Sequence, residues 1–449
     1  MFEIDAQTIK ELQIFSSIKG EKSVLSIFNN VASYGGRDQL EILFRNPLSS
    51  LKSIQDRVDG IRYLEAGKFN IKVDATTLDF IEHYLSLSKI PTRYSYIDGL
   101  RKRVHHILKA NNEYYIISRA IEWMTEIIKN LYSEICLHDQ EKFPALLREI
   151  SGNIRELVES EELFQIYKHN GKRFSAYEIE KFNHILKYKR LDDVRELLRI
   201  IYLIDVFQAV IKTKKRYGFS FAELSETHNI EVQGLYHPFL EKPIPNDISI
   251  TESCNAVFIT GANMSGKSTF MKAFGVSIYL AHMGFPVPAR NMMTPVFDGL
   301  FTTINIPDDL LLGYSHFYSE VKRIKNIAKK VVTGKSYVII FDELFRGTNV
   351  KDASEATFFI INSLSKIKGN TYLFSSHIIE AAEELAQASS EIKFLSFQAT
   401  MKDNSFSYSY LIEPGVSNDR FGMYIIEREG IIELLNKGIE NGSPAKLCV

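Results

Sequence analysis

The sequence has little cysteine, proline or tryptophan and almost no net charge. Its 449 residues include three cysteines, 12 prolines and one tryptophan, and the formal net charge is −1. Because Cys136, Cys254 and Cys448 are far apart and fit no metal-binding spacing, we interpret them as reduced thiols. The charge argues neither for nor against nucleic acid as a partner, since binding needs local basic patches rather than a basic total.

Long apolar runs are also missing. No stretch approaches the roughly 18 apolar residues that cross a membrane. Residues 1–5 are acidic and are not followed by the apolar segment of a signal peptide. We therefore expect a cytoplasmic protein without a membrane partner. Two or three domains are expected, because one hydrophobic core rarely serves so long a chain.

Helical patterns fill the first half of the sequence. Ser23 begins one helix, Gly35-Gly36 interrupts the next, and a further helix is expected over 51–64. Two later segments, 100–143 and 172–217, contain neither proline nor glycine. Helices of about forty residues would each span about 60 Å, which predicts an antiparallel lever. The alternative is a pair of kinked helices folded into a compact bundle.

From about Ile230 the pattern changes to short apolar runs that alternate with helices. This alternation is typical of an α/β domain with a largely parallel sheet. Pro238, Pro243 and Pro245 mark the junction. The sequence therefore predicts a mixed fold, with an all-α domain followed by an α/β domain.

A glycine-rich loop lies between an apolar run over 255–260 and a helical pattern over 270–281. Strand, loop and helix together are the context of a phosphate-binding P-loop, whose backbone N–H groups and helix end face phosphates. Lys267 is expected to reach the β- and γ-phosphates, and the Ser268 hydroxyl to ligate Mg²⁺. The alternative is a chance match in a surface turn. The predicted phosphate-binding residues are Gly261, Ala262, Asn263, Met264, Ser265, Gly266, Lys267, Ser268 and Thr269.

Two carboxylates end a second apolar run, which begins at Tyr337. A buried strand can end in acids where its tip meets something cationic or wet. Asp342 suits coordination of Mg²⁺ through water, and Glu343 suits the task of orienting and deprotonating the attacking water. The alternative for either acid is the N-cap of a helix.

Two further residues are candidates for the same site. His377 follows an apolar run over 371–376, where a neutral imidazole could bond the γ-phosphate or the lytic water. We count it with Lys267 and Glu343 as catalytic, although a lone histidine is usually structural. Ser315 precedes a helical pattern and is a candidate N-cap, which is also compatible with phosphate binding.

Taken together, these motifs resemble those of the MutS family, the ATPases that detect mismatched DNA. The loop is similar to the family's G-P-N-M-G-G-K-S-T, 342–349 to D-E-I-G-R-G-T-S, 313–317 to G-R-S-T-F, and Ser376-His377 to T-H. Segments 35–48, 203–205, 236–238 and 284–289 also resemble the family, so the resemblance covers nearly the whole chain.

The resemblance implies ATP and Mg²⁺ as cofactors and an ABC-type ATPase that dimerises head to tail across two nucleotides. Ser315 would face the γ-phosphate held by the other subunit, and a homodimer would be the active state. We therefore expect a helical core and lever domain over 1–229, an ABC-type ATPase domain over 230–430, and a C-terminal dimerisation tail over 431–449.

Three features depart from the family pattern. The family's mismatch-reading and connector domains precede the core, whereas here the core begins at residue 1, which we interpret as a truncated form. The phenylalanine that stacks on adenine is replaced near Ile244, which can supply only apolar contact. Phe345 stands beside Glu343 where the family has glycine.

The sequence therefore predicts a MutS-like ATPase that couples ATP binding and hydrolysis to binding of a DNA duplex or branched DNA, through the backbone and DNA shape. The alternative is a nucleotide-dependent dimeric regulator of a protein partner that uses no DNA. A transporter subunit would show Leu-Ser-Gly-Gly-Gln before the acids, and none is present. The short spacing from Gly261 to Asp342 excludes the coiled coil of a chromosome-maintenance ATPase.

Overall fold

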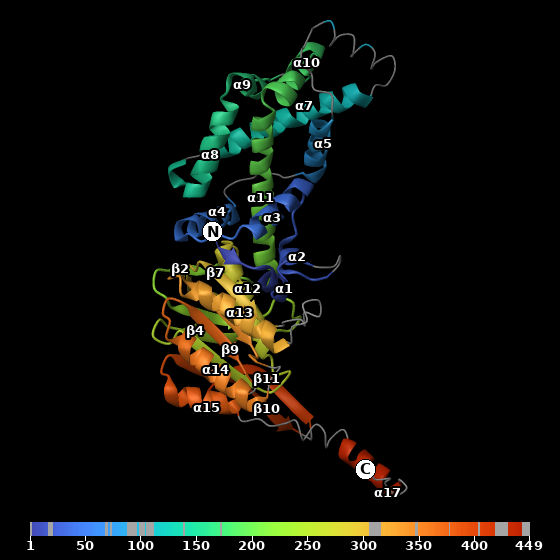
Figure 1. The fold of residues 1–449 in the computed structure, drawn as a ribbon. Helices are drawn as coiled ribbons and strands as arrows, with labels where there is room; N and C mark the ends of the chain where they lie inside the picture. Colours follow the sequence, from blue (N-terminus) through green and yellow to red (C-terminus); the bar gives the residue numbers. More distant parts are fainter. Residues whose placement is uncertain are drawn as a thin grey trace. The chain divides into compact units, whose positions relative to one another are not determined.

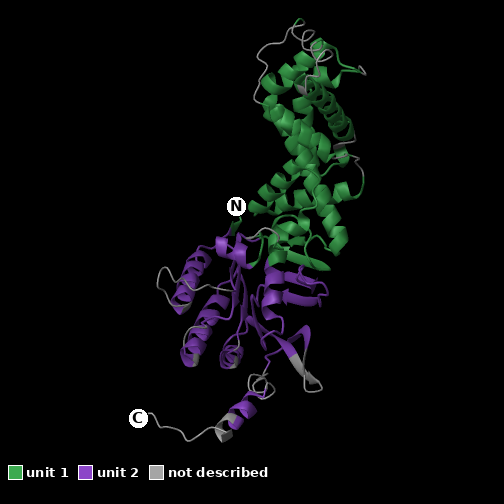
Figure 2. Ribbon diagram, turned by 90° about the vertical axis from the view of Figure 1, so that its right-hand side faces the viewer, with its two compact units in different colours: residues 1–3, 12–226, 276–296 green, residues 4–11, 227–275, 297–449 purple. Residues whose placement is uncertain are grey.

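The computed structural model describes residues 2–16, 21–67, 71, 74–87, 97, 104, 112–137, 140–170, 173–304, 316–345, 349–376, 378–402, 405–417 and 430–441. The chain forms two compact units, each built from more than one stretch (Figure 2). Unit 1 comprises residues 1–3, 12–226 and 276–296, and unit 2 comprises 4–11, 227–275 and 297–449. The fold is mixed, with helices and a mainly parallel sheet, as the sequence predicts.

Unit 1 begins with four helices. They are α2 (Val24–Phe28), α3 (Tyr34–Arg45), α4 (Leu51–Glu65) and α5 (Ala75–Ser86). The start predicted at Ser23 is confirmed, because Ser23 is the N-cap of α2 and its side chain accepts the Ser26 N–H. The predicted interruption at Gly35-Gly36 is wrong, because both glycines lie in the first turn of α3. A Cβ on Gly36 would lie 2.3 Å from Oδ2 of Asp205, so close approach requires glycine there.

The two segments predicted as forty-residue helices are interrupted in the structure. The first contains α7 (Asn112–Leu131) and a π-helical turn, Tyr132–Cys136; most of 100–111 lies outside the described residues. The second is divided into α10 (Ala176–His184), a π-helical turn over Ile185–Lys189 and α11 (Leu191–Tyr217).

Ion pairs of Arg190 accompany the break before α11. Arg190 leaves helical geometry at φ −130° and bonds to Glu162 at 2.7 Å and to Asp193 at 3.1 Å. Glu162 belongs to α9 (Glu161–Tyr167), which follows α8 (Ala145–Val158). The prediction of one continuous helix over 172–217 is therefore wrong.

Helix α11 is the central helix of unit 1, and Figure 1 shows it running between α8 and α5. Its buried side chains lie on most of its faces, from Val194 to Thr213, as expected for a helix surrounded by others. The apolar faces of α5, α7, α8, α9, α10 and α11 share one core. Gly218, in the left-handed conformation at φ +70°, ends α11.

Unit 2 is built on a seven-stranded sheet in the order β1-β7-β8-β9-β5-β10-β11. Its strands are β1 (Glu3–Ile4), β5 (Ala256–Gly261), β7 (Gly299–Thr303), β8 (Tyr337–Asp342), β9 (Thr371–Ser375), β10 (Ile392–Lys402) and β11 (Ser405–Pro414). Strands β7, β8, β9, β5 and β10 run parallel, and β11 pairs antiparallel with β10. The central strands β5, β8 and β9 are almost entirely buried, which explains their uninterrupted apolar sequences.

Helices pack on this sheet through alternate side chains of the strands. In the described part of the carboxyl-terminal half, the helices are α12 (Lys267–His282), α13 (His316–Val331), α14 (Val350–Ser365), α15 (Ile379–Ala388) and α17 (Ile431–Asn441). Apolar residues of α13, α14 and α15 share a core with Phe258, Phe341 and Phe374 of the sheet. In unit 2, β3 (Ile230–Leu235) and β4 (Asn246–Ile250) also pair antiparallel, and in unit 1, β2 (Glu223–Ser225) pairs parallel with β6 (Asn291–Pro295).

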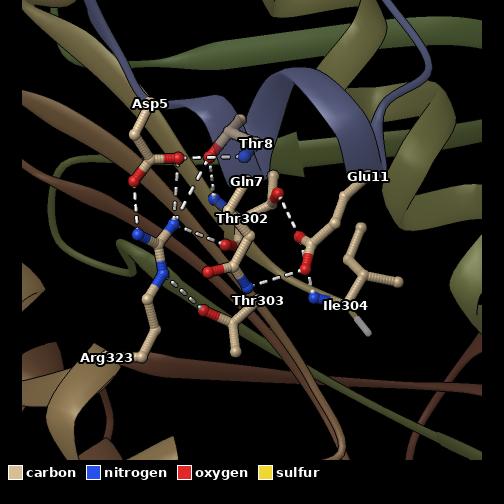
Figure 3. A network of polar contacts seen from close by, with 8 residues as sticks. All are labelled: Asp5, Gln7, Thr8, Glu11, Thr302, Thr303, Ile304 and Arg323. Atoms are coloured by element: carbon tan, nitrogen blue, oxygen red, sulfur yellow. Dashed lines mark hydrogen bonds and ion pairs between the residues drawn. The ribbon is translucent and has the colours of Figure 1, made fainter. Parts of the chain in front are cut away.

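The amino-terminal helix α1 (Ala6–Glu11) belongs to unit 2, where it contacts the carboxyl end of β7 (Figure 3). The buried Glu11 carboxylate accepts the Ile304 backbone N–H at 3.0 Å, and the Thr8 hydroxyl accepts that of Thr302 at 2.9 Å. Arg323 of α13 pairs with Asp5 and donates to the Thr302 carbonyl at 2.8 Å. These bonds join the start of the chain to β7 and α13.

Among the described residues, no helix combines the length and apolar character that crossing a bilayer requires. Cys136 and Cys254 are free thiols, and Cys448 lies outside the described part of the chain.

Candidate nucleotide-binding site

The predicted phosphate loop follows β5 directly and leads into α12. Gly261 has φ +135°, and a Cβ there would lie 2.6 Å from the Phe397 carbonyl oxygen, so only glycine fits. Gly266 has φ +109°, and Met264, whose side chain is 83% exposed, has φ +68°. This backbone reverses direction tightly and brings the chain to the amino end of α12.

Lys267 folds back over this loop. Its buried ammonium donates to the carbonyl oxygens of Gly261 at 2.7 Å and Ala262 at 3.0 Å. The hydroxyl of Ser265 is buried and has no hydrogen-bond partner among the described residues. A positive charge, an unsatisfied hydroxyl and the amino end of a helix thus lie within one short loop, and this combination fits a phosphate group.

The two acids lie at the same edge of the sheet as the loop, because β8, β9 and β5 are parallel. In the register of the sheet, Ser375 lies opposite both Asp342 and Ile259. The Ser375 hydroxyl donates to Oδ1 of the buried Asp342. The Glu343 N–H donates to the Ser375 carbonyl at 3.1 Å and approaches its hydroxyl oxygen at 3.3 Å. Ser375 therefore bonds both acidic residues.

A cavity of about 470 Å³ opens over the loop, within the size range of small-molecule sites. The predicted residues that line it are Ile244, Asn263, Met264, Gly266, Lys267, Ser268, Thr269 and Glu343. Gly261, Ala262 and Ser265 form the loop behind it, and Asp342 lies at the end of β8 next to Glu343. Ser315 and His377 lie outside the described residues.

The cavity is also lined by residues that the sequence did not indicate as part of the site. They include Tyr236, His237, Leu240, Lys242, Asn246, Phe397 and Tyr410. A Cβ on Gly266 would lie 3.5 Å from the Tyr410 ring, so this ring lies over the loop. The Asn246 amide donates to the Tyr410 carbonyl at 2.9 Å and accepts the Ile412 N–H at 2.7 Å, which joins β4 to β11. No local motif marks Tyr410, because folding brings it to the loop from far along the chain.

His237 is neutral in this environment. Burial, together with the charge of Lys272, lowers the pKa of His237 to about 4. The ring also lies 5.0 Å from that of Phe239. The histidine therefore adds no positive charge to the cavity at neutral pH.

The available oxygen ligands fit Mg²⁺ bound together with phosphates. Among the described residues, no group of three His, Cys, Asp or Glu side chains could hold a metal ion by itself. Mg²⁺ is usually held by one or two carboxylates together with substrate phosphates and water, rather than by an all-protein cage. The Ser268 hydroxyl in the cavity wall and the Asp342 carboxylate at the strand end are donors of this kind.

Comparison with known proteins places this site in a family. The model of MutS domain V matches residues 257–438, which contain the loop and both acids. The chain belongs to the MutS family. It is 29% identical over 267 residues to the DNA mismatch repair protein MutS of Geobacillus sp. (strain WCH70), covering 56% of this chain and 31% of that protein.

Other MutS proteins match to a similar extent. The protein of Streptococcus thermophilus (strain ATCC BAA-491 / LMD-9) is 30% identical over 254 residues, which cover 55% of this chain and 30% of the relative. The protein of Lactococcus lactis subsp. cremoris (strain SK11) is 31% identical over 252 residues, which cover 54% of this chain and 29% of the relative. The matched part of this MutS-family chain thus spans about a third of these relatives.

Phe345 is the residue at which this MutS-family chain departs most visibly from the motif that it resembles. It follows the acids in the left-handed conformation, with φ +63°, and its side chain is buried. Its ring packs against that of Phe317 in the first turn of α13. A bulky side chain therefore occupies a backbone conformation that glycine adopts at no steric cost.

Proposed function

We propose that this chain is a Mg²⁺-dependent ATPase that couples ATP binding and hydrolysis to DNA binding, in mismatch repair or a recombination-related process. The observation that carries the proposal is the cavity in which Lys267 and Ser268 of the glycine loop lie together with Glu343. Membership of the MutS family supports it, as does the similarity to relatives that are DNA mismatch repair proteins.

In this proposal the loop holds the triphosphate. Its backbone N–H groups and the Lys267 ammonium contact the β- and γ-phosphates, and the two loop carbonyls that bond this ammonium keep it close to the backbone. Ser268 and Asp342 would hold Mg²⁺, which would neutralise charge on the phosphates. Glu343 orients and deprotonates the attacking water. Proton removal and phosphate binding are thus assigned to different segments of the chain.

The remaining walls of the cavity fit the nucleoside. Ile244 supplies the apolar contact expected from the sequence, and Tyr236 and Tyr410 add aromatic surface near it. An adenine ring is flat and largely apolar on its faces, so such surfaces suit it. His377 and Ser315 complete the proposal as partners of the γ-phosphate, Ser315 from the second subunit.

Two substitutions test the assignment of the site. Lys267→Ala should abolish ATP binding, measured by calorimetry. Glu343→Ala should retain ATP and hydrolyse it orders of magnitude more slowly. Lys351→Ala and Glu355→Ala, which change exposed charges on α14, are the matched controls and should behave as wild type. Hydrolysis at the wild-type rate by Glu343→Ala would contradict its role as general base.

DNA binding is tested separately from hydrolysis. Homoduplex, mismatched and four-way-junction probes are titrated at several salt concentrations, with and without ATP. If the protein contacts the phosphate backbone of DNA, its affinity for DNA should fall steeply as the salt concentration rises. ATP should change the affinity for at least one of the three probes. Equal, weak binding to all three would remove the DNA role and favour regulation of a protein partner.

We further propose that the active form is a dimer. Among the large apolar side chains of α17, Ile431, Ile432, Leu434 and Leu435 are all exposed, which is unusual for a helix of a monomeric protein. Sedimentation with and without ATP measures the association. Leu434→Asp should weaken it, whereas a monomer under every condition would contradict a dimeric active state.

A further inference from the structure

The turn after β8 has an unusual backbone. Glu343 has φ +56° and Phe345 has φ +63°. This left-handed region is unfavourable for residues with a Cβ, and most of all for bulky ones. The motif that residues 342–349 resemble has glycine in place of Phe345. Contacts outside the turn must therefore hold it in this conformation.

Packing around Phe345 supplies such contacts. Its side chain is buried in the core that α13 and α14 share with the sheet. The ring centroids of Phe345 and Phe317 are 5.6 Å apart, and the rings are tilted by 48°, a geometry within the range that aromatic pairs favour. Phe317 lies in the first turn of α13. The two rings thus connect the turn that carries Glu343 with the start of that helix.

Helix α13 is held firmly against the rest of unit 2. Ile324 and Ile327 are buried in the same core. Arg323 donates to the Thr302 carbonyl at 2.8 Å and pairs with Asp5 (Figure 3). The first turn of α13 therefore has a defined position against the sheet, and Phe317 offers a stable surface to the ring that packs on it.

We propose that Phe345 is a positioning residue for hydrolysis: by packing against Phe317, it holds the strained turn that carries Glu343. The proposal rests on the proposed function, in which Glu343 is the general base. Lys267 and Ser268 lie in the first turn of α12, outside the turn that Phe345 holds, so nucleotide binding does not depend on this packing. Loss of the packing should lower kcat and leave nucleotide affinity unchanged.

A double-mutant cycle tests this coupling. Phe317→Ala removes the surface on which Phe345 packs, so kcat for ATP hydrolysis should fall roughly tenfold, which corresponds to the energy of a left-handed residue with a Cβ. The Kd for Mg-ATP should stay within about twofold. In a Phe345→Gly background the turn needs no packing to keep its conformation, because glycine adopts a positive φ at no steric cost. Adding Phe317→Ala to this background should therefore change kcat by less than about twofold.

Phe394→Ala is the matched control. Phe394 is also partly buried against this core, and its ring pairs with that of Phe258 at 5.8 Å and 39°. Its truncation should lower stability and leave kcat unchanged. If Phe317→Ala reduces kcat equally in both backgrounds, or weakens Mg-ATP binding instead of kcat, the proposal is wrong.

A wrong proposed function gives a different result. The wild-type protein would then show no ATP hydrolysis that depends on Glu343, so Glu343→Ala would change nothing. The strained turn has a readout that needs no activity. Phe345→Gly should unfold at a temperature no lower than Phe345→Ala, opposite to the usual order of these residues. A clearly lower unfolding temperature for the glycine variant would contradict the strained turn itself.

Discussion

Ser375 offers the most direct test of how the acids are held. Its hydroxyl donates to Oδ1 of the buried Asp342, and its carbonyl accepts the Glu343 N–H at 3.1 Å. Ser375→Ala removes the first bond and the longer contact from the Glu343 N–H to the hydroxyl oxygen, and leaves the second bond, which belongs to the backbone. A hydrogen bond to a charged group contributes about 1.5–3 kcal/mol. If Asp342 holds Mg²⁺, loss of this bond should weaken Mg²⁺ binding roughly 10- to 100-fold.

The assay is the Mg²⁺ dependence of ATP hydrolysis at saturating ATP. For Ser375→Ala the midpoint should move to higher Mg²⁺, while ATP binding without Mg²⁺, measured by calorimetry, should change little. Ser365→Ala is the control, since Ser365 is equally buried but donates to the Asn362 carbonyl within α14. An unchanged midpoint in a folded Ser375→Ala protein would refute the assignment of Asp342 to the metal.

Three further predictions concern stability. Burial lowers the pKa of His237 from 6.5 to about 4, so its neutral ring contributes fully to the free energy of unfolding above pH 6.5, and this contribution is lost as the pH falls through 4. Urea titrations should show that the free energy of unfolding falls by up to about 3 kcal/mol over this range, and by less in His237→Gln. Gly36→Ala should destabilise unit 1 by about 1–3 kcal/mol in thermal unfolding, because its Cβ would meet Asp205. Although burial raises the pKa of Asp5, the hydrogen bonds from Arg323 and the Thr8 backbone outweigh it and keep that pKa below 3.8. The ionised Asp5 carboxylate therefore stabilises the fold above about pH 4, and this stabilisation is lost below it. In an NMR titration Arg323→Ala should raise the pKa of Asp5.

Each of these predictions has its own control or contrary result. Gly152 in α8 has open space around it, so Gly152→Ala should stabilise slightly, by about 0.5–1 kcal/mol, where Gly36→Ala destabilises. An acid loss of equal size in wild type and His237→Gln would show that other groups cause it. An Asp5 that titrates alike with and without Arg323 would contradict the ion pair of Figure 3.

The elements of the site were predictable because their signals are local. The apolar runs at 255–260, 337–341 and 371–376 correspond to β5, β8 and β9, since a strand buried on both faces must be apolar throughout. The glycines at 261 and 266 have positive φ, as the tight loop requires. Parallel pairing then brings the ends of these strands to one edge of the sheet.

Two predictions were wrong where distant residues overrode local preference. Gly35-Gly36 resembles a helix break, yet the glycines allow α3 to approach Asp205 and Tyr202 of α11. The segment 172–217 has the composition of one long helix, but the ion pairs of Arg190 accompany a break within it. In both cases the sequence around the affected residue does not reveal the distant contact.

The sequence by itself determined the phosphate loop, the two acids behind it and the family resemblance, because each is encoded within a few consecutive residues. Only the tertiary structure decided that residues 4–11 pack on β7 within unit 2, that Tyr410 covers the loop, and that Phe345 packs on Phe317. These contacts join residues far apart in the chain, and side-chain complementarity after folding selects them rather than any local pattern.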